Sequence, residues 1–296
     1  MFNTIDHPFL VPTDGSFSLK QSTTSISSSK TEKDIKQDLR QDQKDLDDLQ
    51  RLLYAHNQFS VLLVFQAMDA AGKDSTIRAV LKGIDPAGCQ AFSFKQPSKE
   101  ELDHDFLWRT AKSLPERGRI GVFNRSYYEE VLVVKVHPEY LAGQRLPYQP
   151  NISDNAAMNK FWNDRYESII DHEKHLARNG TIVLKFFLNV SREEQHRRFL
   201  SRIENPKKNW KFSDSDLAES ALWDKYQEAY QKVLNTTSKP WAPWYAIPAD
   251  NKPLMRHMVC EVIRDNLLQL NLQYPQLNDE DTAKLQSYKE QLIITE

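Results

Sequence analysis

Apolar residues in this chain occur in short runs that alternate with longer segments of helical spacing. Short apolar runs bounded by turn residues predict buried strands, whereas apolar residues that recur every three or four positions predict amphipathic helices. The strands predicted in this way cover residues 61–66, 89–95, 120–123, 181–190 and 244–247. The predicted helices cover residues 34–56, 75–83, 99–114, 155–179, 191–203, 214–234 and 254–272.

The alternation of strands with helices predicts the fold class. A strand that is followed by a helix and then by another strand favours right-handed crossovers and parallel pairing. We therefore expect an α/β fold, a three-layer sandwich in which a five-stranded, mainly parallel sheet carries helices on both faces. With 296 residues, 40% of them hydrophobic, the chain is long enough for one sizeable core.

The polar first thirty residues set the expected domain boundary. They are rich in Ser and Thr, so we expect residues 1–30 to form a flexible N-terminal arm that does not join the core. The remaining residues, 31–296, are expected to form a single domain.

The first predicted strand leads into a sequence typical of phosphate-binding loops. Residues 61–66 are followed by A-M-D-A-A-G-K-D-S and then by a helical segment. Small residues let the backbone wrap an anion, the N–H groups and the helix N-terminus point at it, and the Lys73 ammonium adds charge. Besides Lys73, the residues expected to contact phosphate here are Ala70, Ala71, Gly72, Asp74 and Ser75.

This loop departs from the usual P-loop pattern at two positions. Ala67 stands in place of the first glycine, and Asp74 stands in place of the hydroxyl residue that usually binds magnesium. A tight turn before a helix, with no phosphate site, remains an alternative at this stage. If the loop does bind phosphate, the fold is of the P-loop kinase variety.

Composition narrows the functional classes. The net charge of −2 argues against nucleic acid as a general partner. The chain lacks an apolar stretch of membrane-spanning length and a secretion signal, so we expect no membrane association and a cytoplasmic location. The two cysteines are far apart and show no metal-binding spacing.

Three polar residues follow the strand at 120–123 and suggest catalysis. They are Asn124, Arg125 and Glu129, at the carboxyl end of a predicted parallel strand, where such sheets bind ligands. Phosphoryl transfer requires a metal ion and positive charge around the moving group. We expect Asp69 and Glu129 to bind magnesium, or manganese in its place, because carboxylate oxygens suit these ions.

An arginine-rich helix suggests a lid over residues 191–213. Ser191 and Glu194 predict a capping box, and the helix carries Arg198 and Arg202, which we expect to stabilise charge on the phosphates. A solvated basic helix face is the alternative. Further basic residues expected to line a groove for a long polyanion are Lys82, Lys95, Arg117, Lys135 and Lys211.

Four separated motifs resemble family-2 polyphosphate kinases. They are M-D-A-A-G-K-D at 68–74, F-N-R-S-Y-Y-E-E-V-L-V at 123–133, R-R-F-L-S-R-I-E-N-P-K-K-N-W-K-F-S at 197–213 and P-W-A-P-W-Y-A-I-P-A-D at 240–250. The resemblance covers about residues 35–272. It implies phosphoryl transfer between inorganic polyphosphate and nucleotides, with roles for Asp69, Lys73, Arg125, Arg198 and Arg202.

The second motif also suggests a subclass. Its Asn124 and Glu129 are similar to members that accept both nucleoside mono- and diphosphates, which implies AMP and ADP, with GMP and GDP, as acceptors. We further expect a homo-oligomer, a dimer or tetramer. The alternatives are a nucleoside or nucleotide kinase that uses ATP as donor, and a polyphosphate-binding P-loop protein without turnover.

Overall fold

The computed structural model describes residues 4–294 and contains one five-stranded sheet. Its strands lie in the order β2-β3-β1-β4-β5, and every pairing is parallel. The predicted α/β fold is confirmed. The strands are β1 (Ser60–Gln66), β2 (Cys89–Ser93), β3 (Ile120–Asn124), β4 (Thr181–Asn189) and β5 (Trp244–Pro248).

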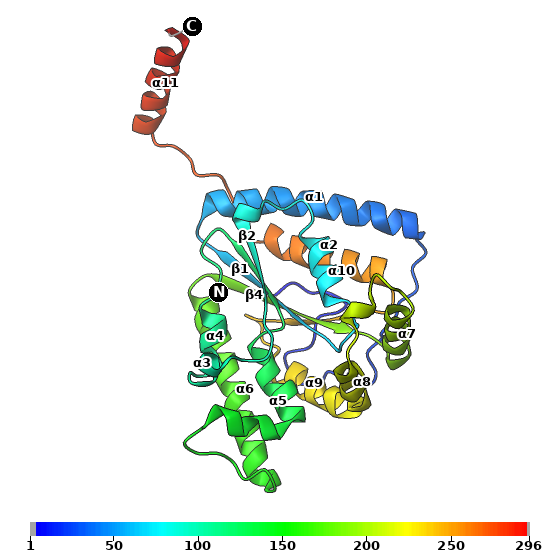
Figure 1. Cartoon of the computed structure of the whole chain (residues 1–296). Helices are drawn as coiled ribbons and strands as arrows, with labels where there is room; N and C mark the ends of the chain where they lie inside the picture. The colour runs from blue at the N-terminus through cyan, green and yellow to red at the C-terminus, as the bar shows by residue number, and fades with distance from the viewer. Residues whose placement is uncertain (1–3, 295–296) are drawn as a thin grey trace.

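Helices cover both faces of this sheet (Figure 1). Helices α1, α2 and α10 lie on one face, while α5, α6 and α9 lie on the other (Figure 1). The bounds are α1 (Glu32–His56), α2 (Lys73–Val80), α5 (Val133–Val136), α6 (Asn155–Arg178), α7 (Arg192–Ile203), α9 (Trp223–Thr237) and α10 (Lys252–Leu268). Short 3-10 helices are η1 (Pro86–Gly88), η2 (Tyr127–Val131), η3 (Pro138–Gln144) and η4 (Asn209–Lys211).

The central strands are apolar because both of their faces are covered. All residues of β1 and nearly all of β4 are buried. Lys185 of β4 is a charged residue in this apolar setting. Its ammonium donates to the Glu173 carboxylate at 2.6 Å and to the Tyr128 hydroxyl at 2.9 Å. Burial of this charge is tolerated because it is paired and hydrogen-bonded, and the contacts tie α6 and η2 to the sheet.

Two predicted helices are each divided in the structure. The predicted helix at 99–114 is two single turns, α3 (Lys99–Leu102) and α4 (Trp108–Ala111), because Asp105 accepts a bond from the Leu107 N–H and forms a turn between them. The predicted helix at 214–234 is α8 (Asp214–Ala221) and α9, separated at Leu222.

The prediction that the N-terminal arm stays out of the core is wrong for the described residues. The Val11 N–H donates to the Trp244 carbonyl at 2.9 Å, and the Ala246 N–H donates to the Phe9 carbonyl at 2.8 Å. Val11 and Leu19 are buried in the core. The arm therefore runs along β5, the outer strand, and occupies backbone groups that a sheet edge leaves unpaired.

The C-terminal part ends in a helix that the apolar pattern did not predict. Helix α11 (Asp279–Ile294) extends away from the sheet and its covering helices (Figure 1). Among the described residues, no helix has the length and hydropathy needed to cross a membrane.

Candidate active site

The loop between β1 and α2 has the backbone geometry of an anion-binding turn. Ala70 has a φ of 61° and Gly72 a φ of 108°, and the Ala71 N–H bonds to the Met68 carbonyl at 3.2 Å. Ala67, which replaces the first glycine of the pattern, is not among the positive-φ residues. A side chain is therefore tolerated there, and this departure does not disturb the loop.

Lys73, the first residue of α2, lies inside the loop. Its ammonium donates to the Ala67 carbonyl at 2.7 Å. Burial lowers the pKa of Lys73, and the Asp69 carboxylate opposes that shift. A phosphate in the loop would oppose it further, since an anion favours the charged ammonium.

Arg125 lies between the two carboxylates that the sequence predicted as metal ligands. Its guanidinium is 3.4 Å from Asp69 and 3.7 Å from Glu129. Its φ of 65° is left-handed, and its N–H bonds to the Phe65 carbonyl of β1 at 3.1 Å. Burial raises the pKa of Glu129, while Arg125 and Lys73 oppose the rise. The structure thus brings together Asp69, Lys73, Arg125 and Glu129.

Asn124, the last residue of β3, is bonded to α2 and to β2. Its amide donates to the Asp74 carboxylate at 2.8 Å and to the Ser93 hydroxyl at 3.2 Å. The hydroxyls of Ser75 and Thr76 both donate to the Gly72 carbonyl, at 2.9 and 3.0 Å. Asp74, which replaces the usual magnesium-binding hydroxyl residue, is thus a hydrogen-bond partner of Asn124.

Magnesium suits the donor set of this site. Asp69 is one-third exposed and Glu129 one-quarter exposed, and both face the same arginine. No group of three or more His, Cys, Asp or Glu side chains in residues 4–294 forms a ready-made metal cage. Magnesium in kinases commonly takes only one or two carboxylates and completes its shell with phosphates and water, so the residues present fit this ion.

Several site residues carry no recognisable signal in the sequence. Asp216 of α8 lies 3.7 Å from Arg202, and its pKa is raised, first by burial and then by the field of Asp69. Tyr230 of α9 is buried within the field of Glu129 and Asp69. The Gln195 amide donates to the Asp69 carbonyl at 2.9 Å. These contacts join segments far apart in the chain, which local spacing does not reveal.

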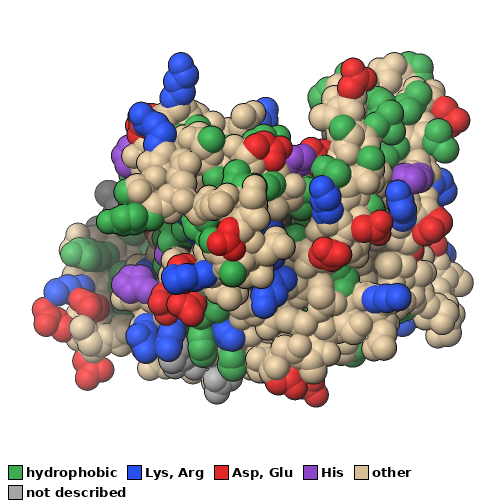
Figure 2. Space-filling model, turned by 90° about the horizontal axis from the view of Figure 1, so that it is seen from below, with side chains coloured by type: hydrophobic (Ala, Val, Ile, Leu, Met, Phe, Trp, Pro, Cys, Tyr) green, Lys and Arg blue, Asp and Glu red, His purple; other side chains and the backbone are tan. Residues whose placement is uncertain are grey.

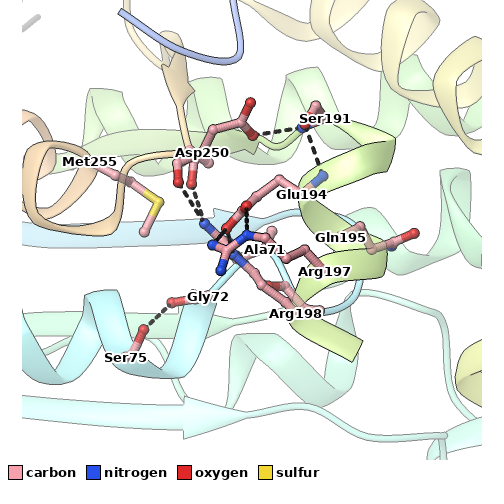
Figure 3. Close-up of polar contacts among 12 residues, drawn as sticks. Ala71, Gly72, Ser75, Ser191, Glu194, Gln195, Arg197, Arg198, Asp250 and Met255 are labelled. Atoms are coloured by element: carbon pink, nitrogen blue, oxygen red, sulfur yellow. Dashed lines mark hydrogen bonds and ion pairs between the residues drawn. The ribbon is translucent and has the colours of Figure 1, made fainter. Parts of the chain in front are cut away.

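The arginines of α7 occupy different positions. Arg202 points toward Asp216 and is partly exposed. Arg198 is buried and reaches the carbonyls of the loop, with Glu194 beside it (Figure 3). Ser191 caps α7 as predicted, accepting from the Glu194 N–H, but the Glu194 carboxylate binds Arg197 and Arg198 instead of completing the capping box.

Of the five residues predicted to line a basic groove, three are positioned or bonded elsewhere. Arg117 precedes β3 and donates to the Gln58 carbonyl, which precedes β1. It therefore lies at the amino ends of these strands, whereas the loop follows the carboxyl end of β1. Lys82 lies beyond the C-terminal end of α2, a helix about 12 Å long that begins at Lys73. Lys135 turns to the Tyr166 hydroxyl at 3.0 Å. Of the five residues, Lys95 follows a strand end as expected, and the Lys211 side chain lies outside the described part.

A different group of cations lies beside the loop, at the start of α10. Burial, with the fields of Arg198, Arg197 and Arg256, lowers the pKa of Lys252 to about 8. The Arg256 Nε is buried without a hydrogen-bond partner in the described chain. Lys252 and Arg197 line a pocket of about 380 Å³ together with Ser25, Glu32, Glu194, Asp250, Asn251 and Pro253.

The surface charge is mixed on the face of the molecule viewed from below (Figure 2). On the face shown in Figure 2, Lys and Arg side chains are interspersed with Asp and Glu. The pocket at the start of α10 is mixed in charge too, since Glu32, Glu194 and Asp250 line it beside Lys252 and Arg197.

One protein family matches most of the chain. The family model described as polyphosphate kinase 2 matches residues 29–146 and 150–276. A crystal structure of polyphosphate kinase 2 from Arthrobacter aurescens TC1 superposes with a TM-score of 0.83 at 33% identity, covering 97% of this chain and 99% of that one.

Two relatives are named for the nucleotides that they phosphorylate. An ADP-polyphosphate phosphotransferase from Rhodopseudomonas palustris is 54% identical over 248 residues, 84% of each chain. An AMP/ADP-polyphosphate phosphotransferase from Meiothermus ruber is 43% identical over 231 residues, 78% of this chain and 80% of the relative. The relatives thus share the polyphosphate substrate and differ in the nucleotides they are named for.

Proposed function

This chain belongs to the polyphosphate kinase 2 family, and on that premise we propose that it transfers the terminal phosphoryl group of inorganic polyphosphate to both AMP and ADP. Phosphoryl transfer between polyphosphate and nucleotides is the activity of the family. The proposal adds AMP to the acceptors, names magnesium as the ion, and assigns the residues. Guanine nucleotides are included as acceptors, and the enzyme is proposed to act as a homo-oligomer.

The observation that carries the assignment is the cluster around Arg125. The loop that begins at Asp69 and ends at Lys73 supplies amides, a carboxylate and an ammonium, and Arg125 adds a second cation within 4 Å of both Asp69 and Glu129. Positive groups around one space suit the transfer of a phosphoryl group between two anionic substrates, polyphosphate and the nucleotide.

The reaction follows from this arrangement. An oxygen of the nucleotide's terminal phosphate attacks the terminal phosphorus of polyphosphate. The new P–O–P bond forms as the bond to the next phosphate breaks, so polyphosphate leaves one unit shorter. Lys73 and the loop amides hold the transferred group, and Arg125 orients the acceptor phosphate. Magnesium, when bound, would neutralise negative charge on the phosphate oxygens.

Asp69 has a second role that its position supports. Its carboxylate is partly exposed beside Arg125, where it can hold the ion or accept a proton from the attacking phosphate.

Substitution of Lys73 tests the site assignment. Lys73→Ala is expected to lower kcat at least about 10³-fold, since the lysine stabilises charge in the transition state. ADP and ATP formation from polyphosphate would be measured with each nucleotide, and ATP would replace polyphosphate in a parallel reaction to test the alternative donor. Lys44→Ala, an exposed lysine of α1, is the matched control. A Lys73→Ala rate close to that of the control would remove Lys73 from the site.

A further inference from the structure

Arg198 is a buried arginine whose donors are all bound to the protein itself. Its side chain is 4% exposed. Nη1 donates to the Ala70 and Ala71 carbonyls at 3.1 and 2.5 Å. Nη2 donates to the Ala249 and Asp250 carbonyls at 2.6 and 3.3 Å, and Nε donates to Glu194 at 2.6 Å.

These bonds account for the five N–H groups of a guanidinium. A phosphate could be reached only by giving up one of them, and the side chain is closed off from solvent. The lid role expected from the sequence, with Arg198 stabilising charge on the phosphates by direct contact, does not fit this position.

The two loop carbonyls explain what the arginine does to the loop. In a trans peptide the C=O and the following N–H point in opposite directions. Because the Ala70 and Ala71 carbonyls are directed to Arg198, the N–H groups of Ala71 and Gly72 point to the other side of the loop. The Ala71 N–H closes the turn on the Met68 carbonyl at 3.2 Å. By the same peptide geometry, the Gly72 N–H is directed away from the arginine.

The same guanidinium holds the loop to a second segment. Figure 3 shows it between Ala71 of the loop and Asp250, which follows β5. The Asp250 carboxylate in turn accepts from the Ser191 N–H at 2.8 Å, at the start of α7. The loop, the end of β5 and the first turn of α7 therefore share one buried connection.

We propose that Arg198 is a positioning residue for phosphoryl transfer, which fixes the phosphate loop from behind so that the Gly72 N–H faces the transferred group. It acts through the loop backbone and makes no contact with substrate. A lysine cannot replace it, because three ammonium donors from one point cannot span four carbonyls and a carboxylate.

The proposal rests on the proposed function, so its test includes a measurement that needs no turnover. Hydrogen exchange of residues 67–76 would be followed in the substrate-free protein, and kcat and KM would be measured with ADP and polyphosphate. Arg198→Lys is expected to raise exchange in the loop at least about tenfold and to lower kcat about 10²-fold, the loss typical of one misdirected transition-state donor. The KM for ADP should change less than threefold.

Chemical rescue separates this role from a general loss of structure. Arg198→Ala removes a whole guanidinium, so millimolar guanidinium chloride is expected to restore at least a tenth of the lost kcat, and methylammonium is not. Arg40→Ala, an exposed arginine of α1, is the control that guanidinium should not affect. If the alanine variant does not fold, the lysine variant carries the test.

Two results would overturn the proposal. One is a kcat for folded Arg198→Lys within threefold of the wild-type value. The other is a large loss of kcat with loop exchange unchanged in the free protein, because that result assigns a direct substrate contact. An inactive wild-type protein would contradict the proposed function instead, and the exchange measurement would still report on the loop.

Discussion

Ala70 and Arg125, two site residues that are not glycine, hold left-handed backbone conformations, with φ values of 61° and 65°. Such conformations are unfavourable for most side chains and persist when the surroundings fix them. Here the Ala70 carbonyl accepts a hydrogen bond from Arg198, and the Arg125 backbone N–H donates to the Phe65 carbonyl. Both residues adjoin the proposed path of the phosphoryl group.

Asn124 allows a prediction that isolates one contact. Asn124→Asp would place a carboxylate 2.8 Å from the Asp74 carboxylate, and the repulsion is expected to lower kcat about tenfold. Adding Asp74→Asn restores a donor and an acceptor in exchanged positions, so the double variant should regain most of the activity. Rates with AMP and with ADP would be measured for all three variants.

A double variant no better than Asn124→Asp would contradict this account. It would mean that Asn124 acts through the nucleotide or the ion rather than through its bond to Asp74.

At this scale the sequence predicted the loop residues well and their partners poorly. Lys73 and Asp69 are recognisable because they belong to one local pattern. Asp216, by contrast, lies within the field of Asp69 although the two residues are far apart in the sequence. The case of Arg198 shows a further limit, since sequence reveals an arginine but not which of its donors are already occupied.

At the scale of elements, α1 and α10 are joined by one buried carboxylate. Asp42 of α1 is bound by His257 and by Arg264 of α10. The hydrogen bond to Asp42 raises the pKa of His257, although burial opposes the rise. A histidine whose folded pKa is above the unfolded value of about 6.5 stabilises the fold fully below that pH.

This pair predicts a pH-dependent stability. The contribution of His257 should be lost as the pH rises through its raised folded pKa. The free energy of unfolding of the wild type should exceed that of His257→Gln by up to about 3 kcal/mol in mild acid, and the difference should shrink toward alkaline pH. Urea unfolding of both proteins across this range measures it. A difference that grows with pH would have the wrong sign.

Most element predictions succeeded where apolar spacing was long and regular. Helix α6 and strands β1 and β4 lie close to their predicted bounds. The failures are short or interrupted elements, as between α8 and α9, because a break at a single residue such as Leu222 leaves the apolar spacing intact. The prediction that Arg117 lines the groove is wrong for a topological reason, since Arg117 precedes β3 and parallel strands bind ligands at their carboxyl ends.

For the whole molecule, the sheet was predictable and the two terminal segments were not. Alternating strands and helices allow few parallel topologies, so the three-layer sandwich follows from the pattern. The arm at residues 4–30 is polar on average, yet a few residues such as Val11 fill the edge of the core. Average composition does not reveal such isolated contacts.

Helix α11 is expected to contribute little to the stability of the domain. Between Gln273 and Ile293 every residue except Asp281 is exposed, and the family match ends at residue 276. Deleting residues 277–296 should shift the thermal midpoint by less than about 2 °C, because little apolar surface is buried there. Thermal unfolding and a kcat measurement test this. A shift of about 10 °C would show that α11 contacts the rest of the protein or a second copy of it.

At the scale of the whole molecule, one site is proposed to phosphorylate two nucleotides in turn. The most direct measurement is a time course with purified protein, magnesium, polyphosphate and AMP as the single nucleotide. The account predicts that ADP appears first and ATP follows, with one phosphate unit lost from polyphosphate for each step. If AMP remains unchanged while ADP supplied separately is converted to ATP, the two-acceptor claim is contradicted.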